Sequence, residues 1–78
     1  MSLHLQAVRL ATGSRDEEGE LVFVDGCLVA VLVRLSDEHD DEAGMWFLEA
    51  GFGRVDHPHP PKFVDLEEAQ AWIADQLS

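Results

Sequence analysis

The sequence predicts an α+β fold in which an antiparallel meander of about four strands is followed by one C-terminal helix packed on one face of the sheet. Three observations indicate this fold: two β-rich runs flank Asp25-Gly26, a further run alternates from Met45 to Phe52, and a helix-capping sequence begins at Asp65. Because 78 residues leave room for only one hydrophobic core, residues 1–78 are predicted to form a single domain.

The hairpin centred on Asp25-Gly26 is the strongest local signal. Asp and Gly accept the positive φ values of a two-residue type I′ turn, whose twist matches that of the flanking strands. This turn is expected to pair Val24 with Cys27, Phe23 with Leu28, Val22 with Val29, and Leu21 with Ala30.

Alternation along these two strands sorts their side chains into two apolar faces. One face is predicted to hold Leu21, Phe23, Leu28, Ala30 and Leu32. The other is predicted to hold Cys27 together with Val22, Val24, Val29, Val31 and Val33. A strand that is apolar on both sides is typical of the middle of a sheet that is covered above and below.

A single helix cannot cover both of these faces. A helix of about 12 residues is roughly 18 Å long and reaches over only one side of a small sheet. The larger side chains match the helix better, which leaves the valine face without a cover. The sequence therefore predicts a homodimer whose two-fold interface is formed by Val22, Val24, Val29, Val31 and Val33. The alternative cover is the first strand together with the Pro-rich segment.

Two further strands complete the predicted sheet. Leu3 to Leu10 alternates weakly and suits an edge strand. The run from Met45 to Phe52 is predicted to direct Trp46, Leu48, Ala50 and Phe52 to one side. Glu49 falls on the opposite side, and if that side is buried its carboxylate needs a partner, for which Arg34 is the natural candidate.

The chain after the last of these strands is predicted to turn and form the helix. Gly51 and Gly53 indicate a bulge or a close approach of two backbone segments. Asp65 is expected to cap the helix, with Glu68 reaching back in a capping box. The helix is predicted to pack on the sheet through a stripe that contains Leu66, Ala69, Trp72, Ile73 and Leu77.

Charge limits the partners that the chain can bind. It contains 16 acidic and 5 basic residues, for a formal net charge of −11. Such a surface repels phosphate backbones and anionic headgroups, so neither nucleic acid nor a membrane surface is an expected partner, whereas a basic protein is a possible one. The single Cys excludes an internal disulfide, and no signal-peptide pattern or long apolar run is present, which together predict a cytoplasmic protein.

The acidic residues are predicted to gather at one end of the sheet. In an up-and-down meander the connections 13–19 and 36–44 lie at the same end. We name this end the acidic pole, and its candidate binding residues are Asp37, Glu38, Asp40, Asp41 and Glu42. It can be a cation site or a docking surface for a basic partner, but it lacks the spacing of an EF-hand loop. A pair of solvated loops that keep the protein soluble is the favoured interpretation.

Histidines provide a second set of candidate metal ligands. The segment His57-Pro58-His59-Pro60-Pro61 carries two imidazoles at alternate positions, and the meander puts His4 at the same end of the sheet. Exposed linker residues are the favoured interpretation of this segment. Cys27 has no sequence signature that ties it to a histidine base, and no catalytic or phosphate-binding motif is present, so neither an enzyme nor a cofactor is expected.

Three functional hypotheses remain open at this point. The first is a homodimeric structural or protein-binding module, and the second is an acidic inhibitor of a basic partner, antitoxin-like or a mimic of nucleic-acid charge. The third is a small metal-binding protein or enzyme. The helix start at 65–69 and the loop at 16–19 resemble segments of small HicB-type antitoxin domains, but both segments are common in unrelated proteins, so no residue role is transferred.

Overall fold

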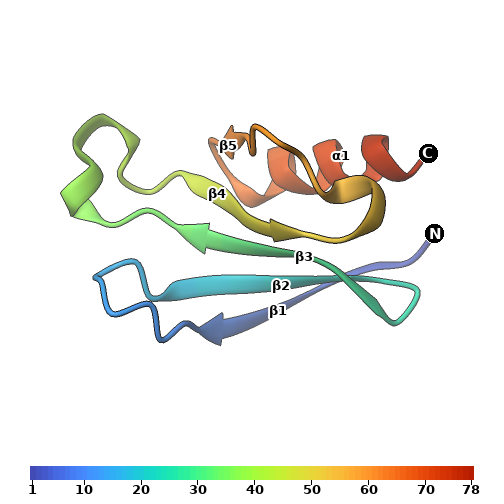
Figure 1. Cartoon of the computed structure of the whole chain (residues 1–78), viewed down its shortest axis with the longest axis horizontal. Coiled ribbons are helices and arrows are strands. Elements are labelled where there is room, and N and C mark those ends of the chain that lie inside the picture. The colour runs from blue at the N-terminus through green and yellow to red at the C-terminus, as the bar shows by residue number, and fades with distance from the viewer.

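The computed structural model describes residues 1–78 and contains one five-stranded antiparallel sheet followed by one helix (Figure 1). The strands lie in the order β1-β2-β3-β4-β5. Their bounds are β1 Leu3–Arg9, β2 Glu18–Val24, β3 Cys27–Arg34, β4 Trp46–Gly51 and β5 Lys62–Phe63. Two short 3₁₀ helices, η1 Asp37–Glu42 and η2 Gly53–Val55, flank β4, and α1 spans Leu66–Leu77. The predicted α+β meander with one C-terminal helix is confirmed.

The fifth strand is the one element of the sheet that the sequence did not predict. β5 has only two residues, which pair with Phe47 and Trp46 of β4 directly after the Pro-rich segment. Proline favours extended backbone, so the chain leaves Pro61 in a conformation that can pair with β4 before the helix begins. This short pairing buries Phe63, of which 2% is exposed.

The turn between β2 and β3 has the predicted two-residue form. Asp25 has φ 51° and Gly26 has φ 85°, both in the left-handed region that a type I′ turn requires. Val24 pairs with Cys27 and Phe23 with Leu28, as predicted.

Beyond these first two pairs the predicted register is wrong. Val22 pairs with Ala30 rather than Val29, because Val29 is an extra residue that forms a β-bulge in β3. Its carbonyl oxygen accepts a hydrogen bond from the backbone N–H of Phe52 (2.9 Å), which ties the bulge to the end of β4. Because of this extra residue, each later side chain of β3 lies on the opposite side of the sheet, relative to β2, from the side predicted.

The bulge decides which side chains the helix covers. Val22, Ala30 and Leu32 are all fully buried in the core, so the predicted separation of valines from the larger side chains is wrong. The opposite side of the sheet, which we name the open face, carries Leu21, Phe23, Leu28 and Val31, none of which belongs to the core cluster.

A second bulge repeats this effect in β4. Val31 pairs with Ala50 and Leu32 with Leu48, so Glu49 is the extra residue. Trp46 and Leu48 therefore face the core, whereas Ala50 lies on the open face, and the expectation that all of them share one side is wrong. Phe52, which continues beyond Ala50, is 50% exposed.

The core lies between the sheet and α1. Ala69 and Ile73 are fully buried, and Trp72 packs against Phe63 with 5.7 Å between ring centroids. The helix begins where predicted, because Asp65 Oδ1 accepts a hydrogen bond from the Glu68 N–H (2.8 Å). The buried cluster comprises Val22, Ala30, Leu32, Trp46, Leu48, Val55, Phe63, Ala69 and Ile73.

Gly51 allows the chain after β4 to fold back against the sheet. A Cβ atom at this position would lie 2.6 Å from the carbonyl oxygen of Val55, which is closer than real Cβ contacts come. The predicted close approach of two backbone segments is confirmed here, and it places Val55 in the core with no exposed surface.

Candidate functional site

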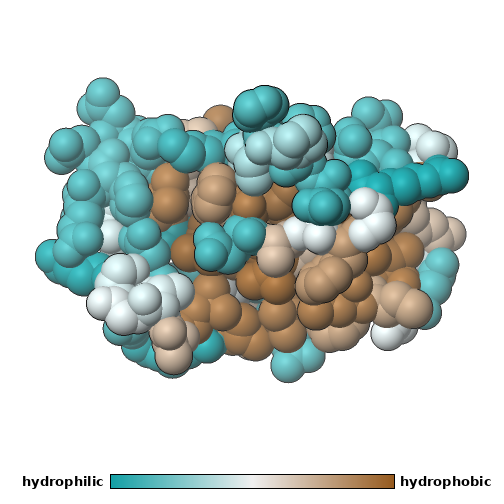
Figure 2. Space-filling view, viewed as in Figure 1, coloured by the Kyte–Doolittle hydropathy of each residue, from teal (hydrophilic) through white to brown (hydrophobic).

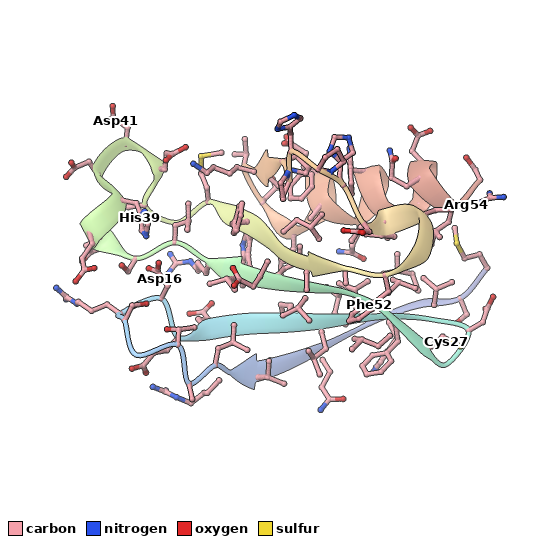
Figure 3. All side chains as sticks on the ribbon, in the orientation of Figure 1. Asp16, Cys27, His39, Asp41, Phe52 and Arg54 are labelled. Carbon is pink, nitrogen blue, oxygen red and sulfur yellow. The ribbon has the colours of Figure 1, made fainter.

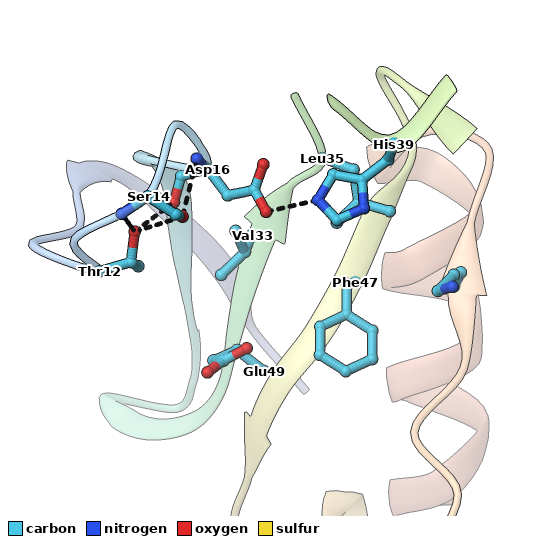
Figure 4. Close-up of a pocket in the computed structure, with 9 residues that line it drawn as sticks. Thr12, Ser14, Asp16, Val33, Leu35, His39, Phe47 and Glu49 are labelled. Carbon is cyan, nitrogen blue, oxygen red and sulfur yellow. Dashed lines mark hydrogen bonds and ion pairs between the residues drawn. The ribbon is translucent and has the colours of Figure 1, made fainter. Parts of the chain in front are cut away.

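A pocket of about 420 Å³ lies at the acidic pole, on the open-face side of the sheet (Figure 4). The β1–β2 connection and the η1 segment form its rim, and β3 and β4 supply its floor. Its nine lining residues are Thr12, Ser14, Asp16, Val33, Leu35, His39, Phe47, Glu49 and Lys62.

Asp16 joins the two loops that form the rim. Its Oδ1 accepts a hydrogen bond from the backbone N–H of Ser36 (2.8 Å), and its Oδ2 lies 2.6 Å from His39 Nε2. Because a carboxylate can only accept, Nε2 of His39 carries the proton in this arrangement. The hydrogen bonds from Ser36 and then from His39 lower the pKa of the Asp16 carboxyl from 3.8 to about 2. The carboxyl group is therefore ionised whenever the protein is folded near neutral pH.

Hydroxyl groups fix the loop that carries Asp16. Thr12 Oγ1 accepts from the Ser14 N–H (3.2 Å) and lies 2.9 Å from Ser14 Oγ. Ser14 Oγ in turn accepts from the Asp16 N–H (3.2 Å), and the Thr12 hydroxyl donates to the Asp16 carbonyl (3.1 Å). Ser14 makes no hydrogen bond to His39, so the aspartate, histidine and serine are not connected in the relay that nucleophilic catalysis uses.

Two further charged side chains line the pocket. Lys62 Nζ donates to both carboxylate oxygens of Glu42, at 2.9 and 2.8 Å, and so links β5 to η1. Glu49 is exposed and makes no hydrogen bond or ion pair. Arg34, the partner expected for Glu49 if that face were buried, instead lies 4.0 Å from Glu18. The pairing is absent because the bulge leaves Glu49 in solvent.

The topology brings the acidic residues together as predicted. The connections 13–19 and 36–44 lie at the same end of the sheet (Figure 1). The side chain of Asp16 joins them through its contacts with Ser36 and His39. Figure 3 shows His39 directed toward Asp16, whereas Asp41 points away from the body of the protein. Asp37, Glu38, Asp40 and Asp41 are exposed, and Glu42 is half-buried at the Lys62 ion pair.

The histidine candidates for metal binding are not brought together. His4 packs near Phe23, with 6.3 Å between ring centroids, and His57 lies 6.1 Å from Trp72. His57 Nδ1 accepts from the backbone N–H of His59 (3.1 Å), which is a local turn contact. In the whole chain no three His, Cys, Asp or Glu side chains are placed to hold one metal ion.

The five valines proposed as an interface are divided by the bulge in β3. Val22 is fully buried in the core, and Val33 is only 4% exposed at the floor of the pocket. Val29 packs against the core, and Val24 lies on the same side of the sheet as Val22. Of the five valines, only Val31 therefore lies on the open face with appreciable accessible surface.

The open face itself carries an apolar surface that extends away from the acidic pole. Figure 2 shows hydrophobic residues gathered over β1, β2 and β3, with hydrophilic residues at the end that holds the acidic loops. Its partly or fully exposed members on β2, β3 and β4 and just after β4 include Leu21, Phe23, Leu28, Val31, Ala50 and Phe52. We name these six residues the open-face patch.

Sequence reasoning found the acidic residues of the site and missed its pocket. Asp16 belongs to the connection 13–19 and His39 to the connection 36–44. These connections were predicted to meet at one end of the sheet, which is the signal that could have suggested the pairing of the two side chains. The contribution of Phe47 and Glu49 to a pocket depends on the bulge in β4 at Glu49. Gly51 and Gly53 indicated a bulge near the end of this strand only as one alternative, and they did not place it at Glu49.

Comparison with known proteins identifies no relative. No family model matches the chain, no curated protein matches it, and no solved structure matches it. The structure contains no helix long and apolar enough to cross a lipid bilayer.

Proposed function

We propose that the protein is a homodimeric protein-binding module that assembles through the open face of its sheet. The observation that carries the proposal is the open-face patch, because α1 covers the opposite side of the sheet, whereas the six patch residues lie outside the core and stay partly or fully exposed. Contiguous apolar surface of this kind marks an interaction site in soluble proteins. The proposed interface is the patch itself, with Val31 as the one residue retained from the valine set.

The size of the open face favours a small interface with a second copy of the chain. The principal extents of 35 and 21 Å set an upper limit of about 700 Å² on one side of the whole molecule, acidic pole included, so the open-face patch buries less than the roughly 800 Å² per partner of a standard protein interface. A two-fold dimer is the simplest way to cover it, since one self-complementary surface is sufficient.

Charge selects the orientation of the two sheets. With a two-fold axis parallel to the strands, the two acidic poles would lie side by side and repel each other. With the axis perpendicular to the strands, the poles lie at opposite ends of a molecule 35 Å long. At physiological ionic strength this separation exceeds several Debye lengths of about 8 Å, so repulsion between the poles is largely screened. The antiparallel arrangement is therefore the one we propose.

Sedimentation equilibrium of the untagged protein at micromolar concentration tests the dimer. The chain has a mass of 8.7 kDa, so a dimer sediments with twice this mass. Val31→Asp is expected to give a monomer that stays folded, because Val31 is partly exposed and the new carboxylate remains hydrated in the monomer. Ala71→Asp, on the exposed side of α1, is the matched control and stays dimeric. A monomeric wild type, or a dimeric Val31→Asp variant, would refute the proposed interface.

Cys27 gives a separate test of the orientation. It is exposed beside the hairpin turn, at the end of the sheet opposite the acidic pole (Figure 3). In the antiparallel dimer, spin labels on the two Cys27 residues are expected about 30 Å apart, from strand rises of ~3.4 Å and a ~10 Å separation of the sheets. Distances on the order of 10 to 15 Å would instead indicate parallel sheets.

A second candidate function is that of an acidic ligand for a basic protein partner. It is favoured by the acidic pole, where the Asp16 contacts hold two acidic loops side by side. The wild type is expected to bind a basic partner in a salt-sensitive way, and this binding is expected to be lost when the acidic residues of η1 are neutralised.

No enzymatic reaction is proposed. A reducing compartment such as the cytoplasm suits the exposed free thiol of Cys27 and forms part of the proposal.

A further inference from the structure

The charged groups around the pocket at the acidic pole are paired with one exception. Asp16 is paired with His39, and Lys62 is held by both oxygens of Glu42. Glu49 projects from the bulge in β4 and makes no hydrogen bond or ion pair. Figure 4 shows its carboxylate on the pocket side of the sheet, below the Asp16–His39 pair. Glu49 is therefore the one charged side chain of the pocket that no hydrogen bond or ion pair engages.

The floor of the pocket is apolar. Val33, Leu35 and Phe47 contribute it, and Val33 and Leu35 are almost fully buried. The ring of Phe47 lies beside Glu49 in Figure 4. An aromatic face next to a carboxylate attracts a cation through both the ring quadrupole and the formal charge.

The rim of the pocket is held by hydrogen bonds within the chain. Asp16 is fixed by Ser36 and His39, and its loop is held by the Thr12 and Ser14 hydroxyls. A site whose walls are already ordered loses little conformational entropy when a ligand binds. The volume of about 420 Å³ lies in the range of small-molecule pockets.

From these features we infer that the pocket binds an organic cation, with a guanidinium or ammonium group at Glu49 and an apolar stem over Val33 and Phe47. An anion would be repelled by Glu49 and by the net charge of −11. A wholly apolar ligand would bury the Glu49 charge without a partner. A cation on an apolar stem satisfies both parts of the pocket. This inference does not require the dimer, because every lining residue belongs to one chain.

Such a cation has two sources, a free small molecule or an arginine side chain on another protein. Both sources present a cationic group on an apolar stem. Titration of ¹⁵N-labelled protein with N-butylguanidinium, followed by amide chemical shifts, tests whether the pocket binds such a group. A ligand of this size is expected to bind with a dissociation constant on the order of 1 to 10 mM. The shifts are expected to centre on Asp16, His39, Phe47 and Glu49. The neutral isostere N-butylurea is expected to bind at least about fivefold more weakly.

A blocked peptide, acetyl-Ala-Arg-Ala-amide, distinguishes the two sources. Affinity at least about tenfold higher than that of N-butylguanidinium, a gain of ~1.4 kcal/mol, would assign the pocket to a protein side chain. Equal affinity would assign it to a free cation. Both outcomes support a cation site.

Variants of the pocket complete the test. Glu49→Gln keeps the shape of the side chain and removes its charge, and it is expected to weaken N-butylguanidinium binding about fivefold. Phe47→Leu is expected to weaken it about threefold through loss of the cation–π contact. Glu67→Gln, an exposed glutamate of α1 outside the pocket, is the matched control with unchanged affinity. Absence of binding, equal binding of the urea, shifts centred elsewhere, or an unaffected Glu49→Gln variant would overturn the inference.

Discussion

Removing the Asp16 carboxylate is expected to destabilise the protein in a pH-dependent way. Asp16 accepts hydrogen bonds from Ser36 N–H and His39 Nε2, and 18% of its side chain is exposed. A pKa lowered from 3.8 to about 2 corresponds to roughly 2.5 kcal/mol at 1.36 kcal/mol per unit. Solvent screening reduces this contribution to about 1 to 2 kcal/mol. The Asp16→Asn variant is expected to lose this amount of unfolding free energy at about pH 6.

The pH dependence follows from the direction of the pKa shift. Because the pKa of Asp16 is lower in the folded state, its stabilisation is fully present above about pH 4 and is lost as the pH falls toward about 2. The difference in unfolding free energy between wild type and Asp16→Asn is therefore expected to shrink toward zero at about pH 2. Urea denaturation followed by tryptophan fluorescence measures this difference, since Trp46 is only 7% exposed in the folded protein.

A matched control separates this effect from the general charge of the acidic pole. Asp41 lies on η1, is exposed, and makes no hydrogen bond or ion pair. Asp41→Asn removes the same charge and is expected to change the unfolding free energy by less than about 0.5 kcal/mol at either pH. If Asp16→Asn and Asp41→Asn behave alike, or if the loss in Asp16→Asn persists at about pH 2, then Asp16 does not join the two loops as described.

Three further predictions concern stability and are measured by thermal unfolding. Gly51→Ala is expected to cost about 1 to 3 kcal/mol, because its Cβ would lie 2.6 Å from the Val55 carbonyl oxygen; an unchanged melting temperature would contradict this close approach. Gly26→Val is expected to cost about 1 to 3 kcal/mol, because a β-branched residue is strained at φ 85°, whereas Gly26→Asn is tolerated much better; equal melting of the two variants would argue against the turn. Simultaneous neutralisation of Asp37, Glu38, Asp40, Asp41 and Glu42 to Asn or Gln is expected to change stability by less than about 1 kcal/mol in metal-free buffer, since only Glu42 forms an ion pair; a large loss would contradict solvated loops.

Several features of the fold could be predicted because they depend on neighbouring residues. The turn at Asp25-Gly26 follows from the positive φ values that these two residues accept, and the helix start at Asp65 follows from its hydrogen bond to the Glu68 N–H. Predicting that the acidic loops lie together also required the strands to follow one another in up-and-down order, which the structure has. For that reason the acidic pole was predicted, whereas the pairing of Asp16 with His39 within it was not.

The sequence by itself determined the α+β class, the turn, the helix cap and the end of the sheet at which the acids collect. Only the tertiary structure decided which face the helix covers, because a strand repeats every two residues and one bulged residue exchanges its faces. Val29 and Glu49 are the two bulged residues. The Val29 carbonyl oxygen accepts a hydrogen bond from Phe52, just after the neighbouring strand β4. The bulge at Val29 puts Val22 on the same face as Ala30 and Leu32, and Leu21 on the same face as Val31. The bulge at Glu49 leaves this carboxylate in solvent beside the pocket. These positions are fixed by pairing between residues that are distant in the sequence. The local preferences of single residues carry no information about that pairing.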